Sequence, residues 1–243
     1  MRTLRRLLYL GLGTYGLLLA GCAAFQRQLL YFPTQKGNSP PIQTWKHGVT
    51  RPANEPQTIW LLLHGNAGQA QHRLRYPCFP PDGALYILEY PGYGPRPGQP
   101  SRESFNRAAE EAYLELRKDH PGLPLIVVGE SIGSGPACHL ATLPTPPDKL
   151  ILATPFDELA RVAQNQIPLL PIRWILRDNW NNLEALRAYH GPLEIWIAEN
   201  DRVIPPQHAE TLAQSRPQAI LNYLPGGHND WSPQARFTYQ GSE

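Results

Sequence analysis

The chain has 243 residues, which is enough for one sizeable core and typical of a single domain. Apolar residues make up 42% of it and charged residues 17%, which excludes a disordered or fibrous protein. The formal net charge is +2, and it would be −1 without the three arginines near the N-terminus, so neither nucleic acid nor another polyanion is indicated as a partner.

The first 21 residues have the pattern of a targeting segment. A basic start, from Met1 to Arg6, precedes an apolar stretch, and the tetrapeptide LAGC then ends at Cys22. This tetrapeptide resembles the lipobox of bacterial lipoproteins, in which the cysteine is lipidated and becomes the new N-terminus. We therefore expect a signal peptide over residues 1–21 and lipidation of Cys22. In that class Ala23, as the next residue, implies export to the outer membrane.

An uncleaved anchor is the alternative for the same segment. No charge lies between Leu7 and Phe25, and about 20 apolar residues are enough to span a bilayer. Four glycines in this stretch weaken it as a helix, which favours the cleaved form. Under both interpretations the domain over residues 22–243 is exported and held at a membrane.

Short apolar runs alternate with helical patterns through the rest of the chain. We expect strands at residues 58–63, 84–90, 125–129, 149–153, 193–198 and 219–224, whose continuous apolar character is typical of parallel strands buried on both faces. Residues 101–118 and 206–214 place apolar side chains on one helical face. The alternation predicts an α/β fold with a mostly parallel, doubly wound sheet, to which residues 28–49 add antiparallel edge strands.

Residues 154–192 are about twice as long as one crossover helix requires. They are rich in apolar side chains, among them Leu159, Val162, Leu170 and Trp174. An insertion of this character suits a small cap over a substrate pocket. A crossover helix with a long entry loop explains the same length, and the sequence favours neither.

The run from Leu125 to Ser134 carries the clearest motif. It reads LIVVGESIGS, and its centre matches the G-x-S-x-G nucleophile elbow, a sharp strand-to-helix turn that exposes the serine, here Ser131. Side chains two residues before and two after the serine would clash in such a turn, so Gly129 and Gly133 fit it. Backbone N–H groups at the start of the helix would stabilise negative charge there. Ser131 is the expected nucleophile.

A serine hydroxyl needs a base, and the base needs a group that orients it. His228 lies in a glycine-rich loop after the last expected strand and is the expected base. His139 lies down the helix that follows Ser131, away from the elbow. Five other histidines lie in polar surroundings and are expected to be solvated: His47, His72, His120, His190 and His208.

The expected acid is Asp201, which lies in a D-x-V-x-P run just past a strand. Asp157 follows an earlier strand and is the alternative. Glu199 and Asp230 are neighbours of the favoured positions, and Asp230 is expected to hydrogen-bond within its own loop.

Acyl transfer also requires donors for the developing oxyanion, and one such donor is worth about 3–4 kcal/mol. We expect the backbone N–H groups of Ile132 and of Asn66 (or Ala67) to serve, the latter from the loop HGNAG at residues 64–68. Cys78 and Cys138 lack the spacing of metal ligands and are expected to be core residues. No metal or cofactor is predicted.

Taken together, these motifs look like those of the membrane-tethered branch of the α/β-hydrolase superfamily. The matching runs, which extend from about residue 26 to residue 231, are FQRQLLYFPT, HGNAG, EYPGYG, GESIG, ENDRVIPP and GGHND. In relatives the third run is usually D-Y-R-G-Y-G, from which Glu89 and Pro91 depart. The superfamily implies the α/β-hydrolase fold, and its order of nucleophile, acid and base is the order of Ser131, Asp201 and His228.

The resemblance implies a serine hydrolase that cleaves carboxylic esters or thioesters through an acyl-Ser131 intermediate. Its substrate would be a small-molecule or lipid-like ester. A tethered peptidase or amidase is one alternative, although no run supplies a negative or aromatic subsite for a peptide. A catalytically silent binding domain is the other, although such domains usually lose one residue of the triad and all three are present.

Overall fold

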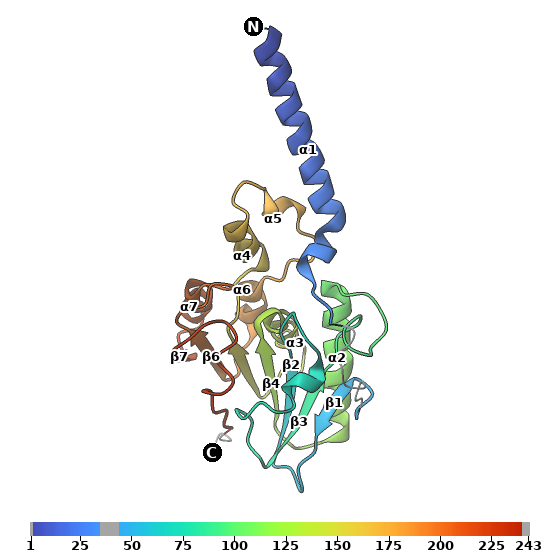
Figure 1. Ribbon diagram of the computed structural model, residues 1–243. Coiled ribbons are helices and arrows are strands. Elements are labelled where there is room, and N and C mark those ends of the chain that lie inside the picture. The colour runs from blue at the N-terminus through green and yellow to red at the C-terminus, as the bar shows by residue number, and fades with distance from the viewer. Residues whose placement is uncertain (1, 35–43, 240–243) are drawn as a thin grey trace.

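A seven-stranded sheet forms the body of the protein, and one long helix projects from it (Figure 1). The computed structural model describes residues 2–34 and 44–239. The strands are β1 (Gly48–Arg51), β2 (Thr58–Leu63), β3 (Gly83–Leu88), β4 (Leu125–Glu130), β5 (Lys149–Ala153), β6 (Leu193–Ala198) and β7 (Ile220–Leu224). The α-helices are α1 (Arg2–Leu30), α2 (Arg102–Asp119), α3 (Ser134–Leu140), α4 (Leu159–Gln166), α5 (Ile172–Ile175), α6 (Asn182–Ala185) and α7 (Pro206–Ser215). Three 3-10 helices are η1 (Ala70–Arg73), η2 (Ser131–Gly133) and η3 (Leu186–Ala188).

The strand order is β1-β3-β2-β4-β5-β6-β7. Only β1 is antiparallel to its neighbour, β3, and the other pairs are parallel. The chain leaves β2 toward one edge of the sheet and then returns to place β4 on its other side. In open α/β sheets such a switch point opens a crevice at the carboxyl ends of the strands, which is where ligands bind. Here that crevice lies between the ends of β2 and β4.

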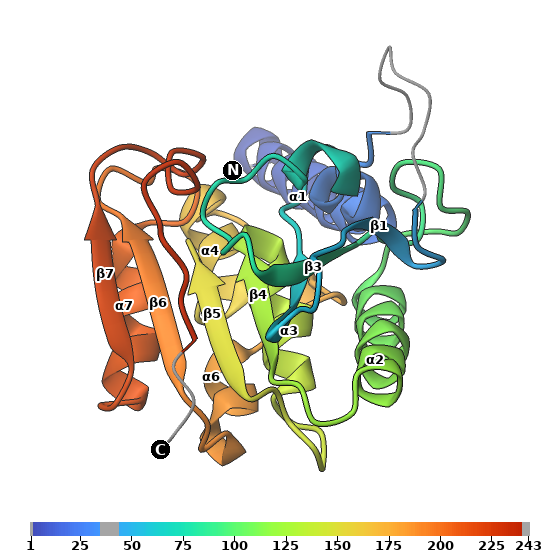
Figure 2. The ribbon, with the colours of Figure 1, turned by 90° about the horizontal axis from the view of Figure 1, so that it is seen from below.

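Helices and loop segments cover both faces of the sheet (Figure 2). An apolar core lies on each face, separate from the other. On one face α2, α3 and α7 pack against alternate strand residues such as Leu61 and Val127. On the other face η1 and the C-terminal segment pack against the residues in between, and Trp231 and Phe237 are the large side chains of that segment. This burial on both faces is the reason that the strand sequences are continuously apolar.

The predicted fold class is therefore confirmed, and the six expected parallel strands occur within two residues of their expected bounds. Antiparallel edge strands were expected from residues 28–49. Among the described residues of that range, only Gly48 and Val49 lie in such a strand, β1. The strand β1 begins only at Gly48, and residues 28–30 continue α1. Residues 35–43 of the expected range lie outside the described residues.

The insertion at residues 154–192 folds into the short helices α4, α5, α6 and η3 in place of one long crossover helix. Its first part, α4, α5 and the loop between them, stands beside α1 at the end of the sheet from which α1 projects (Figure 1). We call this part, residues 159–175, the cap. Its second part, α6 and η3, returns to pack on α3 and α7.

Candidate active site

Ser131 lies directly after β4, at the turn into η2 and α3. Its φ angle is 53°, which is a strained conformation for a residue with a side chain. The two flanking glycines permit the turn: a Cβ on Gly129 would lie 2.7 Å from the Cβ of Ala137, and one on Gly133 would overlap the carbonyl of Leu63. The clash predicted for both positions is therefore real, and the turn presents the Ser131 hydroxyl at the carboxyl end of the sheet.

The structure brings Ser131, His228 and Asp201 together in one chain of hydrogen bonds. The Nε2 atom of His228 lies 2.8 Å from Oγ of Ser131, and its Nδ1 atom lies 2.6 Å from Oδ2 of Asp201. The other oxygen of Asp201 accepts the backbone N–H groups of Val203 and Ile204, both at 2.8 Å. A carboxylate held in this way keeps the imidazole proton on Nδ1 and leaves Nε2 free to accept the serine proton.

The competing acids have other partners. Asp157 pairs with His208, whose Nδ1 atom lies 2.6 Å from its Oδ1 atom. Asp230 accepts the N–H group of Gly227 at 2.7 Å, within its own loop, as expected. Glu199 is exposed.

Two of the histidines expected to be solvated are buried, and that prediction was wrong for them. His208 is only 4% exposed, because its ring on α7 meets Asp157 in the segment between β5 and α4. His47 is buried beside Trp45 and faces Glu115. Burial lowers the pKa of His47 by more than Glu115 raises it.

The two residues expected to supply the oxyanion donors, Asn66 and Ile132, both line the pocket that holds Ser131. The side chain of Asn66 has a further role that the sequence did not indicate. Its Nδ2 atom donates to the carbonyl of Leu30 at 2.7 Å, and its Oδ1 atom accepts the N–H group of Phe32 at 3.1 Å and the hydroxyl of Tyr93 at 2.7 Å. The HGNAG loop is thereby bonded to the end of α1.

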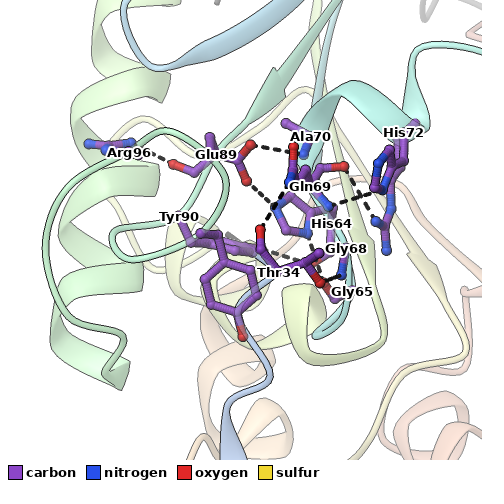
Figure 3. A network of polar contacts seen from close by, with 12 residues as sticks. Thr34, His64, Gly65, Gly68, Gln69, Ala70, His72, Glu89, Tyr90 and Arg96 are labelled. Atoms are coloured by element: carbon purple, nitrogen blue, oxygen red, sulfur yellow. Dashed lines mark hydrogen bonds and ion pairs between the residues drawn. The ribbon is translucent and has the colours of Figure 1, made fainter. Parts of the chain in front are cut away.

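A second set of contacts also holds this loop (Figure 3). Thr34 accepts the N–H group of Gly68 with its hydroxyl at 3.0 Å and the side-chain amide of Gln69 with its carbonyl at 3.1 Å. His64 is buried, and its Nε2 atom lies 3.2 Å from Oε1 of Glu89. Glu89 is one of the two residues that depart from the superfamily pattern. These contacts leave the loop little freedom to move relative to β2.

Glu130, the variable residue before the nucleophile, is also buried and also supports this loop. Its carboxylate accepts the N–H group of Gly65 at 3.0 Å, Nε of Arg73 at 3.3 Å and the hydroxyl of Tyr76 at 3.2 Å. Burial lowers the pKa of Arg73, but Glu130 and the nearby tyrosines raise it by more, so the guanidinium stays charged. The pattern G-x-S-x-G gave no signal for this role because it leaves the residue free.

The site opens into a cavity of about 300 Å³. Its polar members include Ser131, His228 and Asn66, but most of its wall is apolar: Leu30, Phe32, Ile132, Phe156, Leu159, Val162, Val203 and Ile204. Leu30 and Phe32 come from the end of α1 and the segment after it, and Leu159 and Val162 come from α4. The long helix and the cap therefore form part of the pocket wall.

The described residues hold no cluster of three or more histidine, cysteine or acidic side chains that could bind a metal ion. Cys78 and Cys138 are buried, as expected, and burial raises the pKa of Cys78 to about 12. Cys22 lies within α1 and is partly exposed. By length and composition α1 could cross a membrane, and none of its most apolar window is buried.

No protein-family model matches the chain. An uncharacterized protein of Mycobacterium tuberculosis is 30% identical over 232 residues, which cover 84% of this chain and 81% of that protein. The alpha/beta hydrolase domain-containing protein WAV2 of Arabidopsis thaliana is 27% identical over 276 residues, with coverage of 90% and 86%. Among solved structures, the Pyrococcus furiosus esterase Pf2001 shares the fold, with a TM-score of 0.60, 14% identity and coverage of 81% and 90%. The chain therefore has the α/β-hydrolase fold, and its sequence is similar to that of a protein with an alpha/beta hydrolase domain.

The chain is also similar to the lysophosphatidylserine lipase ABHD12 of Danio rerio. The two are 30% identical over 175 residues, which cover 63% of this chain but only 46% of that lipase. The chain thus spans about half the length of that relative.

Proposed function

We propose that this hydrolase is a membrane-tethered serine esterase or thioesterase that acts on lipid-like substrates with one acyl chain. The observation that carries the proposal is the chain of contacts from Asp201 through His228 to Ser131, at 2.6 Å and 2.8 Å, at the floor of an apolar pocket. The pocket volume is near the lower end of the usual range for ligand sites, about 300–1,000 Å³, which suits a single acyl chain. The similarity to a lysophosphatidylserine lipase supports the same substrate class.

The reaction proceeds by two acyl transfers. Oγ of Ser131 attacks the substrate carbonyl carbon while its proton passes to Nε2 of His228, and Asp201 stabilises the imidazolium that forms. Backbone N–H groups of Ile132 and Asn66 bind the oxyanion of the tetrahedral intermediate. Its collapse breaks the bond to the leaving alcohol or thiol, which takes the proton from His228. Water then attacks acyl-Ser131 by the same route and releases the carboxylic acid.

Labelling with a fluorophosphonate probe tests this assignment on the full chain in detergent. Ser131→Ala is expected to lose both labelling and hydrolysis of p-nitrophenyl esters. Ser215→Ala, which removes an exposed hydroxyl from α7, is the matched control and should keep both. Undiminished labelling of Ser131→Ala would exclude Ser131 as the nucleophile. A series of p-nitrophenyl esters of increasing acyl length then tests the pocket, because turnover should decline once the chain outgrows it.

We also propose that cleavage before Cys22 and lipidation of that residue produce the mature protein, a lipoprotein of the bacterial outer membrane. The basic start and the LAGC tetrapeptide support this proposal. A single acyl chain binds a membrane only marginally, so several chains on one cysteine would give a stable tether. Intact mass spectrometry of membrane-extracted protein should find a chain that starts at a lipid-modified Cys22, with the modification absent in Cys22→Ser. A chain that retains residues 2–21 would show an uncleaved anchor instead.

A further inference from the structure

The tip of the cap, residues 167–175, exposes large apolar side chains. Leu169 is 84% exposed and Trp174 is 90% exposed. All six tryptophans of the chain are among the described residues, and Trp174 is the only exposed one. Side chains of this size are ordinarily buried. Together on the loop before α5 and on α5 itself, they mark an interaction surface.

The cap tip is bonded to the apolar helix α1 at two levels. The hydroxyl of Tyr15 donates to the carbonyl of Leu169 at 2.9 Å. Farther along α1, Gln26 donates to the carbonyl of Ile175 at 3.0 Å and accepts the N–H group of Arg177 at 2.7 Å. Tyr15 and Gln26 are about 16 Å apart along the helix. The cap tip therefore extends beside α1 over that length, away from the sheet (Figure 1).

The position of α1 determines the surroundings of the cap tip. The uncharged stretch from Leu7 to Phe25 is about 28 Å long as a helix, close to the bilayer core of about 30 Å. With this stretch in the bilayer, Gln26 lies at the interface and Tyr15 near the middle, so Leu169 lies within the hydrocarbon. Cleavage before Cys22 would remove Tyr15 but keep Gln26, one turn after the lipidated residue. The cap tip would then lie beside the acyl chains.

The backbone of the cap tip has the hydrogen bonding that hydrocarbon requires. The carbonyls of four consecutive residues each lie within hydrogen-bond distance of a protein side-chain donor. Leu169 accepts from Tyr15 at 2.9 Å, and Nε2 of Gln164, which has two protons to donate, lies 3.4, 3.2 and 2.8 Å from the carbonyls of Ile167, Pro168 and Leu170. The Gln164 carbonyl also accepts the N–H group of Ile172 at 3.0 Å.

An exposed loop in water does not need such internal partners, because water satisfies its carbonyls. A loop in lipid does, because an unsatisfied carbonyl costs several kcal/mol there. Two of the loop residues are also prolines, Pro168 and Pro171, which have no N–H group to satisfy. This pattern favours a lipid environment over a protein partner, which could supply polar groups of its own.

We infer that the cap tip inserts into the membrane that holds α1, with Leu169 deepest in the hydrocarbon and Trp174 closer to the interface that Gln26 marks. Arg173, beside Trp174, is ion-paired with Glu158. One consequence rests on the proposed function. The pocket is lined by Leu159 and Val162 of α4, by Leu30 at the end of α1 and by Phe32 just after it, so apolar side chains lead an acyl chain from the bilayer to Ser131.

Trp174 offers a direct test of insertion, because α1 contains no tryptophan and the other five are not exposed. The full chain is reconstituted in phosphatidylcholine vesicles whose acyl chains carry bromine, which quenches nearby tryptophan. In brominated vesicles the wild type is expected to lose a blue-shifted component of its tryptophan emission, compared with vesicles without bromine. Trp174→Phe should lack this component in both kinds of vesicle. Equal quenching of the two proteins would overturn the inference. Quenching of Trp174 by aqueous iodide would also overturn it. So would a finding that Trp174 is buried against a second copy of the chain in detergent without lipid.

The consequence for substrate access has a separate test. The double variant Leu169→Ser with Trp174→Ser is compared with Leu114→Ser, which changes a 52% exposed leucine on α2. With a soluble short-chain p-nitrophenyl ester all proteins should give the same kcat/KM. With a long-chain ester dissolved in the vesicles, kcat/KM of the double variant should fall about tenfold or more, as expected for losing the burial of a large apolar side chain.

The outcomes of this second test separate the two proposals. An unchanged rate on the vesicle ester would contradict entry through the cap tip. Equal losses on both esters would show that the cap tip only supports the fold. If the wild type cleaves neither ester, the proposed function fails, whereas the bromine quenching still reports on insertion.

Discussion

The protein contains two aspartate–histidine pairs of nearly the same geometry. In each, Nδ1 of the histidine lies 2.6 Å from a carboxylate oxygen, in the pair Asp201–His228 and in the pair Asp157–His208. In each, the aspartate is buried and follows a strand of the sheet. Both carboxylates therefore hold the imidazole proton on Nδ1.

The pairs differ in what faces the other ring nitrogen. Nε2 of His228 faces the hydroxyl of Ser131 at 2.8 Å, beside the pocket. Nε2 of His208 faces the side-chain amide of Asn165 at 3.4 Å, between α7 and α4. In one case the imidazole thus faces the hydroxyl of the proposed nucleophile, and in the other it forms a contact between α7 and α4. The comparison shows that an aspartate–histidine pair alone does not identify an active site.

The largest expected difference between the pairs is in turnover. Asp201→Asn should lower kcat by orders of magnitude, because an amide favours the wrong imidazole tautomer, and the same change in a well-studied serine protease costs about 10⁴. Asp157→Asn should leave kcat within a few-fold of the wild type. Steady-state kinetics with one p-nitrophenyl ester compares both variants. If Asp157→Asn is the crippling change and Asp201→Asn the mild one, the two roles must be exchanged.

The second expected difference is in stability. Burial raises the pKa of Asp157, but the hydrogen bonds from His208 and the Glu158 N–H group and the charge of Arg161 lower it by more, so it lies below its ordinary value. A carboxyl whose pKa is depressed by folding stabilises the fold above its unfolded pKa, about 3.9, and this contribution is lost as the pH falls through the folded pKa.

Asp157→Asn should therefore lower the melting temperature at neutral pH. A hydrogen bond to a charged group is worth about 1.5–3 kcal/mol, which corresponds to about 3–12 °C for a chain of this size. The gap between variant and wild type should narrow as the pH is lowered below about 4. Thermal unfolding in detergent followed by circular dichroism measures it, and a gap that does not depend on pH would contradict the electrostatic explanation.

The smallest expected effect comes from Arg161, which forms an ion pair with Asp157 from α4. Its side chain is 44% exposed, so solvent screens the pair and its worth is at most about 1 kcal/mol. Arg161→Ala should lower the melting temperature by a few degrees at most, and added salt should reduce the difference further. A loss as large as that of Asp157→Asn would mean that Arg161, not His208, carries the interaction.

The N-terminal segment shows where the sequence patterns stopped short. The leader pattern ended at Cys22, but α1 continues to Leu30, and the next residues bond to the HGNAG loop. Nothing in the sequence around Asn66 indicates that its side chain hydrogen-bonds to residues more than thirty positions earlier. Contacts between segments so far apart depend on how the chain folds back, which no local pattern encodes.

The sequence by itself determined the sheet, because runs of apolar residues must be buried on both faces, and it determined the elbow, because only glycine fits at residues 129 and 133. It also singled out Ser131, Asp201 and His228, which the structure brings together. Each of them follows a strand, and parallel strands share one carboxyl edge. Only the tertiary structure decided that His208 is buried against Asp157 and that the cap tip lies along α1. The reason is that a strand or a tight turn is specified by neighbouring residues, whereas the partner of a buried polar side chain is set by the packing of distant segments.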